Sequence, residues 1–341
     1  MKQCKENNEA NYIFKLKKII LIAILLLSLP FVHGWGGDSY AQQMPYYTQF
    51  KNSSFMLNPA VAGTQGTLYA STCYRMQWVG YDDAPRTSGV SVNGRLFEGK
   101  LGAGLYMMQD EVGPSKQTNY GASCAFHLRF PDCEFSTGLA GNFGKYTLMG
   151  NKMLIHNSQD PSIDQTANHT ANVSDASAGI YLYNDRFHIG FSAMHLLQSR
   201  AEFFQNDSVK KGFVKYATQV YSTLGYNYSQ NPDFVFENTL FVNYVTAVPL
   251  MIDYTLRVHY RGKVFAGVSV RLRDAIAIHV GATIMERFQV AYSYDILVSK
   301  FRNYSSGTHE IVLKYSFTKG IDDKNNPKIK KFAHQKYSNL F

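Results

Sequence analysis

The sequence predicts an all-β protein, a transmembrane antiparallel β-barrel of about 14 strands that follows a cleaved signal peptide. Apolar and polar side chains alternate over many segments of about ten residues, the pattern of β-strands with one apolar face. After Pro30 no apolar run approaches the roughly twenty residues that a membrane helix needs. Tyr (24) and Phe (23) are abundant and only 17% of residues are charged, which is typical of outer-membrane barrels. A soluble β-sandwich array is the alternative that shares this composition.

The N-terminal 41 residues have the features of a secretory signal peptide. Three lysines between residues 15 and 18 precede an unbroken apolar run from Ile19 to Leu29, which is too short to cross a bilayer as a helix. Small residues at Ser39 and Ala41 predict cleavage before Gln42, so residues 1–41 would be removed on export. An uncleaved membrane anchor is the alternative interpretation.

Residues 42–66 show no alternation and contain Pro45 and Pro59. We expect an ordered leader without strands, either a cap at the periplasmic end or a plug folded into the barrel. Residues 67–318 would then form the outer-membrane barrel. The expected strands are Thr67–Gly80, Arg86–Phe97, Gly99–Gln109, Gln117–Phe130, Cys133–Tyr146, Ala176–Tyr183, Arg186–His195, Gly212–Gln230, Asp233–Val245, Pro249–Tyr260, Val264–Arg271, Ala275–Met285, Arg287–Ser299 and Gly307–Thr318. An even number of strands returns both barrel ends to the same side of the membrane.

The connections between these strands sort by length. Every second connection belongs to a set that contains the long ones, Asp110–Lys116, Thr147–Asp175 and Leu196–Lys211, whereas those in between, such as Pro131–Asp132, have one to three residues. Outer-membrane barrels have long extracellular loops and short periplasmic turns, and a sandwich has no reason to sort its loops in this way. The pattern therefore predicts an outer-membrane location, with the leader and the C-terminal tail in the periplasm.

The last expected hairpin, Glu286 to Phe317, shows the two faces most clearly. Phe288, Val290, Tyr292, Tyr294 and Ile296 alternate with Gln289, Ala291, Ser293 and Asp295. This pattern predicts a lipid-facing exterior and a polar interior. The charged side chains expected in the lumen are Asp253, Arg257, Arg261, Arg271, Asp295, Glu310 and Lys314. They would either form ion pairs that fill the barrel or line a selective pore; inward-facing Phe241 and Phe265 favour a filled interior.

The formal net charge of +9 is concentrated at the C-terminus. Residues 319–341 form a basic tail in which six lysines face only Asp322 and Asp323. Such a tail is either simply solvated or an electrostatic contact for an acidic partner or for lipid head groups. Nucleic acid is not an expected partner of an exported protein. Cys73, Cys124 and Cys133 remain after cleavage, and we expect them to be free thiols.

The sequence contains no catalytic motif. Neither HExxH, CxxC nor GxSxG occurs, and GLAGNFGK at Gly138 to Lys145 has the wrong spacing for a phosphate-binding loop. We expect no enzyme activity and no cofactor or metal. One alternative is a cation site in the longest loop, which would use His156, Asp160, Asp164, His169 and Asp175; a solvated polar loop is the simpler interpretation.

Three segments resemble the PorP/SprF family of the type IX secretion system of Bacteroidota. They are PYYTQFKNSSFMLNPAVAGTQG near the mature start, YRMQWVGYDDAPRT over the first loop, and YSYDILVSKFRNYSSGTHEIVLKYSF in the closing hairpin. The positions that carry the family signature are Asn58, Pro59, Ala60, Gly63, Arg75, Gln77, Trp78, Gly80, Pro85, Asp295, Asn303, Ser306, Gly307, His309 and Glu310. We expect these residues to be structural or to bind a partner.

The resemblance implies an outer-membrane barrel of the secretion and gliding machinery. Such a barrel would assist export or surface anchoring of a cognate adhesin or another large surface protein. It would also contact lipoproteins of the periplasmic secretion ring and outer-membrane lipid, and the resemblance implies no catalysis. The alternative function is an outer-membrane diffusion or uptake channel.

Overall fold

The computed structural model describes residues 45–96, 99–152, 168–203, 212–231, 233–246 and 248–317. The predicted signal peptide, residues 1–41, and the basic tail, residues 319–341, lie outside these ranges. So do His156, Asp160 and Asp164 of the candidate cation loop. Among the described residues, no helix is both long and apolar enough to cross a membrane.

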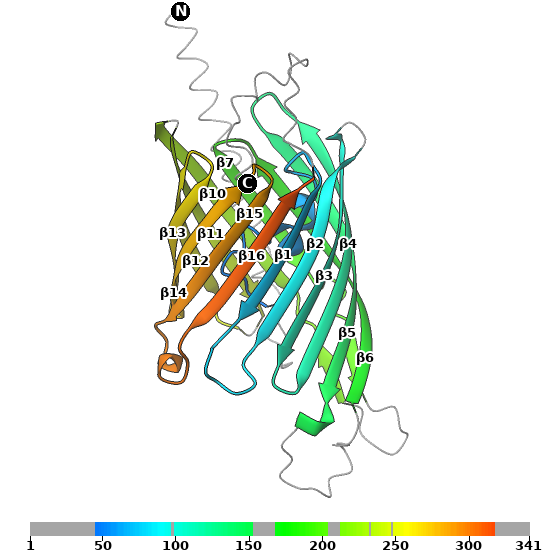
Figure 1. Cartoon of the computed structure of the whole chain (residues 1–341). Coiled ribbons are helices and arrows are strands. Elements are labelled where there is room, and N and C mark those ends of the chain that lie inside the picture. The colour runs from blue at the N-terminus through cyan, green and yellow to red at the C-terminus, as the bar shows by residue number, and fades with distance from the viewer. Residues whose placement is uncertain are drawn as a thin grey trace, which may run out of the picture. The chain divides into compact units, whose positions relative to one another are not determined.

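Fourteen strands form one closed antiparallel barrel (Figure 1), which confirms the predicted fold class and strand number. They are β1 (Tyr69–Met76), β2 (Arg86–Leu96), β3 (Leu101–Val112), β4 (Ser115–Arg129), β5 (Glu134–Met149), β6 (Asn168–Tyr183), β7 (Phe187–Met194), β10 (Gln219–Asn231), β11 (Phe234–Val245), β12 (Met251–Tyr260), β13 (Val264–Arg271), β14 (Ala275–Ile284), β15 (Phe288–Leu297) and β16 (Thr308–Ser316). Each strand pairs with its neighbour in this order, and β16 closes the barrel on β1.

The two faces of the barrel wall have opposite chemistry. On β15, Tyr292 and Ile296 are exposed on the outside, whereas Ser293 and Asp295 are buried on the inside. Leu139 on β5 is 69% exposed, although a water-soluble protein would bury it. A contiguous apolar exterior around a polar interior suits a barrel surrounded by hydrocarbon.

The two ends of the barrel also differ. We call one end the turn end; it carries the short connections, such as Arg261–Lys263, together with the start of β1 and the end of β16. The opposite end, which we call the loop end, carries the connections β5–β6 and β7–β10 and the short helices η4 (Gly150–Lys152) and η5 (Lys300–Asn303). In Figure 1 the turn end is at the top.

The predicted strands and loops are wrong in two respects. The first is that two loops are shorter than expected: inside the expected loop Thr147–Asp175, β5 continues to Met149 and β6 already begins at Asn168. The expected loop Asp110–Lys116 contains only Gly113 and Pro114, because β3 and β4 keep pairing up to Val112 and Ser115. Gly113 has a φ of +55°, which a glycine adopts without steric cost. The second error is that one strand was expected over Gly212–Gln230, where the structure has two.

The chain turns between β9 (Gly212–Lys215) and β10, and β9 pairs with β8 (Arg200–Phe203) in a separate two-stranded sheet at the loop end. The turn buries Tyr216, which packs in one apolar cluster with Phe203, Tyr146 and Val173. Burying these side chains against the extensions of β5 and β6 is favourable. This packing explains why the segment leaves the barrel wall.

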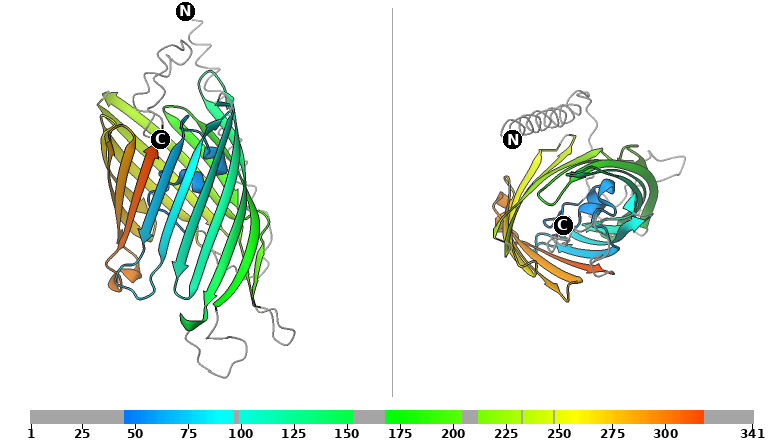
Figure 2. Two further views of the ribbon diagram at one scale, coloured as in Figure 1. Left: turned by 45° about the vertical axis from the view of Figure 1, so that its right-hand side comes forward. Right: turned by 90° about the horizontal axis from the view of Figure 1, so that it is seen from above.

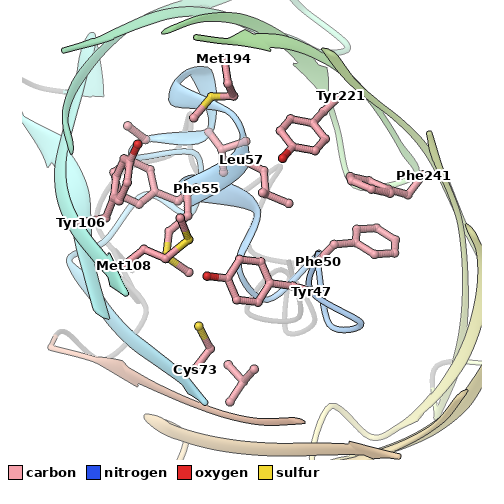
Figure 3. Packing of buried hydrophobic residues seen from close by; sticks show 14 of the residues in the cluster. Tyr47, Phe50, Phe55, Leu57, Cys73, Tyr106, Met108, Met194, Tyr221 and Phe241 are labelled. Atoms are coloured by element: carbon pink, nitrogen blue, oxygen red, sulfur yellow. The ribbon is translucent and has the colours of Figure 1, made fainter. Parts of the chain in front are cut away.

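The chain before β1 lies inside the barrel (Figure 2). We call residues 45–66 the plug; it contains the one-turn helix α2 (Ser54–Leu57) and the 3₁₀ helix η2 (Pro59–Val61). Its apolar side chains pack against inward-facing residues of the wall, as Figure 3 shows. The cluster includes Tyr47, Phe50, Phe55, Met56, Tyr106, Met108, Tyr221 and Phe241. The phenyl rings of Phe50 and Phe241 stack with their centroids 4.5 Å apart.

Glycines on the inner wall let the plug backbone approach closely. A Cβ atom added at Gly138 on β5 would lie 2.5 Å from the Ala60 nitrogen, and one at Gly102 on β3 would lie 2.0 Å from the Ala62 oxygen. Both distances are far below van der Waals contact, and both involve backbone atoms. Any side chain at these positions would therefore displace η2 from the wall.

This packing predicts that Gly138→Ala destabilises the barrel by about 1–3 kcal/mol, because the new methyl group overpacks the contact with the plug. The measurement is urea-induced unfolding of the purified protein in detergent. The matched control is Gly141→Ala on the same strand, where an added Cβ meets no atom within 4 Å; its effect should stay within about 0.5 kcal/mol. Equal effects of the two substitutions would contradict the tight contact.

Candidate functional site

Arg75 on β1 lies at the centre of the most prominent charge cluster of the lumen. Its side chain is almost fully buried. One terminal nitrogen, Nη1, lies 3.0 Å from Glu310 Oε2 on β16, and the other, Nη2, lies 3.2 Å from Asp295 Oδ2 on β15. These ion pairs therefore cross the seam at which the last strand of the barrel closes on the first.

The same two carboxylates bind the plug. Glu310 accepts hydrogen bonds from the backbone N–H groups of Thr48 and Gln49, at 2.8 and 2.9 Å. The Thr48 hydroxyl donates to Asp295 at 2.7 Å and accepts a hydrogen bond from Arg75. Because bonds to charged groups are stronger than neutral ones, these contacts fasten the plug to the closing strands.

Arg271 on β13 extends the cluster along the wall. It lies 3.3 Å from Asp295, and its Nε atom lies 3.5 Å from Asp253. Its guanidinium carbon is 3.9 Å from the ring centroid of Tyr46, a cation–π contact, and the Tyr46 hydroxyl donates to Asp253 at 2.7 Å. We call Tyr46, Thr48, Arg75, Asp253, Arg271, Asp295 and Glu310 the plug lock.

A further ion pair, outside the plug lock, holds the plug to β11. Lys51 Nζ lies 2.5 Å from Glu237 on β11, and Glu237 also lies 2.7 Å from His259 Nε2. Burial lowers the pKa of Lys51, because the charged form is poorly solvated in the lumen, and the Glu237 carboxylate opposes this shift.

The family-signature residues of the leader fix the plug near the turn end. Asn58 donates to the carbonyl oxygens of Ile180 and Phe191 at 3.2 and 3.4 Å and accepts from the Ala60 N–H at 2.9 Å. Pro59 occupies the first turn of η2, where its missing N–H costs nothing. The Ala60 oxygen accepts a hydrogen bond from Ser136 at 2.7 Å.

Gly63 ends this contact with the wall. Its φ of +75° is one that side chains rarely adopt. Its carbonyl oxygen accepts a hydrogen bond from Arg95 Nε at 2.6 Å, and its N–H donates to Asn93 at 3.2 Å. Arg95 in turn lies 2.7 Å from Glu134, so this anchor reaches from β2 to β5.

The remaining signature residues join the first and last loops at the loop end. The Val79 N–H donates to Gly307 at 2.9 Å and its oxygen accepts from the Ser306 N–H at 2.8 Å. The Trp78 and Phe301 ring centroids are 4.6 Å apart. In the first loop, the Gln77 N–H donates a hydrogen bond to the Pro85 carbonyl oxygen, and Gly80 has a φ of +95°. In the last hairpin, Asn303 is exposed on η5. His309 lies on the outer face of β16, with its Nδ1 atom 2.6 Å from the Tyr292 hydroxyl.

The structure brings together most of the charges expected in the lumen. Asp253, Arg257, Arg271, Asp295 and Glu310 are buried on the inner face, and Lys314 also points inward, because it alternates with the outward-facing Tyr315. Phe241 and Phe265 are buried inside as well.

Arg261 is the exception among the expected lumen charges. It lies exposed at the turn end, 3.0 Å from Asp233. Strand β12 ends at Tyr260, and Arg261 begins the turn with a φ of +50°. The alternation that predicted its position therefore stops one residue earlier.

Sequence reasoning did not single out the plug residues Tyr46, Thr48 and Lys51, or the Arg95–Glu134 pair. The sequence offers two signals for the plug residues, a segment without alternation and the family resemblance of residues 45–66, and neither assigns a role to these three side chains. Cys73, Cys124 and Cys133 are free thiols. Within the described ranges no three His, Cys, Asp or Glu side chains gather as metal ligands.

A family profile described as "Type IX secretion system membrane protein PorP/SprF" matches residues 39–315, a span that includes the whole described plug and nearly the whole barrel. The chain belongs to this family. This PorP/SprF protein is therefore an outer-membrane β-barrel component of the type IX secretion system. No curated protein sequence matches the chain.

Several solved outer-membrane proteins are distantly similar in structure. Omp33 of Acinetobacter baumannii is 9% identical, with a TM-score of 0.43 over 74% of this chain and 98% of that chain. The toluene transporter TodX of Pseudomonas putida is 10% identical, with a TM-score of 0.44 over 82% and 94%. A FadL homologue of Pseudomonas aeruginosa is 10% identical, with a TM-score of 0.44 over 78% and 94%. Similarity at this level carries no argument about function.

The plug lock predicts that Arg75→Met destabilises this PorP/SprF barrel by about 3–5 kcal/mol, because two buried carboxylates lose their shared cation. Urea-induced unfolding of the protein in detergent measures the loss. Arg261→Gln is the control, since it breaks the exposed pair with Asp233, and it should cost less than about 1 kcal/mol. The ion pairs would be unimportant if both variants unfolded like the wild type.

Proposed function

We propose that this PorP/SprF barrel assists export or surface anchoring of a cognate large surface protein, such as an adhesin, that it meets at the loop end. The turn end then faces the periplasm and contacts lipoproteins of the secretion ring. The observation that carries the proposal is the filled lumen: plug side chains pack in one cluster with inward-facing residues from strands all around the wall. A filled barrel fits an assembly platform better than a conduit.

The loop end offers a surface for protein binding. Phe213 on β9, Leu197 before β8, and Tyr81 and Tyr304 beside the seam are each more than half exposed. Apolar side chains that stand on loops rather than on the lipid-facing wall often mark interaction sites. The guanidinium carbon of Arg200 lies 5.0 Å from the Phe213 ring centroid, so this surface also carries a positive charge.

The turn end offers a different set of contacts. Much of the plug is buried in the lumen, so the periplasmic contact that we propose falls to the short turns and the basic tail. Met285, at the tip of the β14–β15 turn, is 88% exposed. We propose that these turns approach the ring lipoproteins.

Site-specific photocrosslinking in cells tests both contacts. A photoreactive residue at Phe213 should form an adduct with the exported surface protein, and one at Met285 should form an adduct with a periplasmic lipoprotein. The same residue at Leu139 on the lipid-facing wall is the matched control and should form neither. Mass spectrometry identifies the adducts.

A reversed result, with the surface protein captured at Met285, would show that the proposed orientation is wrong. If the surface protein were captured at none of the positions and reached the cell surface normally after deletion of this gene, the proposed function would be wrong.

The filled lumen also makes a prediction about the alternative function, a diffusion or uptake channel. The pure protein in a planar lipid bilayer should show no steady conductance, because the plug fills the lumen. The double variant Asp295→Asn, Glu310→Gln weakens the plug lock and should show intermittent openings. Steady open-channel currents from the wild type would favour the channel.

A further inference from the structure

One row of inward-facing positions crosses six neighbouring strands through directly paired residues. The register pairs Glu237 with Arg257, Arg257 with Gly267, Gly267 with His279, His279 with Ser293, and Ser293 with Glu310. All of these side chains except the glycine are polar, and all face the plug. The row is therefore a continuous polar strip on the wall from β11 to β16.

The plug binds the two ends of this row. Glu237 pairs with Lys51 at 2.5 Å and with His259 at 2.7 Å. Glu310 accepts two backbone hydrogen bonds from the plug and pairs with Arg75. Both carboxylates thus already bind groups that lie outside the row.

The middle of the row has polar atoms without partners. Arg257 Nε and Nη2, both ring nitrogens of His279 and the hydroxyl of Ser293 have no hydrogen-bond partner within the described part of the chain. The same holds for the hydroxyl of Ser269, which lies beside the row, two residues after Gly267 on the inner face of β13. Their residues are only 0–2% exposed. Buried donors normally find a partner, because leaving them unpaired is costly.

The local geometry holds the Arg257 side chain over Gly267. A Cβ atom at Gly267 would lie 2.7 Å from Arg257 Cγ, so the glycine makes room for the arginine stem. The guanidinium carbon lies 5.3 Å from the Phe265 ring centroid. Arg257 and His279 are close enough to interact electrostatically.

Around the Arg257 guanidinium, cationic side chains outnumber carboxylates. Arg257 and Lys51 share the single carboxylate of Glu237, and Lys314 lies within electrostatic range of all three. Asp295 is bound by Arg75 and Arg271 instead. A water molecule would satisfy the hydrogen bonds here but would not balance the charge.

We propose that Arg257, His279 and Ser293 of this strip, together with the neighbouring Ser269, bind a small inorganic anion between the plug and the wall of β12–β15. The guanidinium supplies the charge, and the serine hydroxyls and the histidine supply further donors. Binding at this place adds a second contact between the plug and these strands, and it includes β14, which contributes no residue to the plug lock. The inference does not depend on the proposed secretion partner.

Bromide, a heavy analogue of chloride, is the probe. Titration with bromide against gluconate at constant ionic strength should raise the Tm of the full-length wild type in detergent, as binding to the folded state requires. Arg257→Met should abolish this saturable rise. The double variant Ser269→Ala, Ser293→Ala keeps the positive charge of Arg257, and its apparent Kd for bromide should be about tenfold higher. Arg261→Gln, which alters an exposed pair, should titrate like the wild type.

If Arg257→Met does not fold, the weaker bromide response of the double serine variant tests the proposal in its place. Anomalous diffraction from crystals grown in bromide should show a peak within hydrogen-bond distance of Arg257. Phosphate in place of bromide shows whether oxyanions fit as well. The proposal is wrong if the wild type shows no saturable rise, if the variants respond as the wild type does, or if the site holds only water.

Discussion

The buried ion pairs between Arg75, Asp295 and Glu310 are the interaction on which the rest of this structure depends. They join β1 to the two strands that close the barrel. Removing charges from water is costly, and the cost is recovered only when every charged group finds good partners. Here the partners include the plug backbone, so closing the wall and filling the lumen satisfy the same charges. The strands and the plug therefore specify one another.

The strand pattern could be predicted from the sequence because alternation is local. The inner and outer faces of β15, for example, follow directly from Phe288 to Ile296, since lipid and lumen select opposite side chains at successive positions. Prediction failed where the strand ended or left the wall. Arg261 begins a turn, and Gly212–Lys215 pairs with β8 to bury an apolar cluster, and neither event changes the local period.

The plug could not be predicted in the same way, because its contacts are distant in sequence. Thr48 and Glu310 are 262 positions apart, and no spacing rule links them. The family resemblance marked Asn58, Arg75 and Glu310 without assigning their roles. In the structure these residues hold the plug or the seam, which gives the signature positions a structural role.

The position of the plug at the start of the chain has a consequence for biogenesis. Translation produces Thr48 and Gln49 first and Glu310 last, yet the first two donate to the third. The plug therefore cannot reach its final state until the last strand arrives, and long-range contacts of this kind form slowly. In an incomplete barrel the part of the plug around Thr48 would be unfastened, although Asn58 and Gly63 could already contact the earlier strands. Whether this segment is bound to Glu310 therefore distinguishes closed barrels from barrels that have not yet closed.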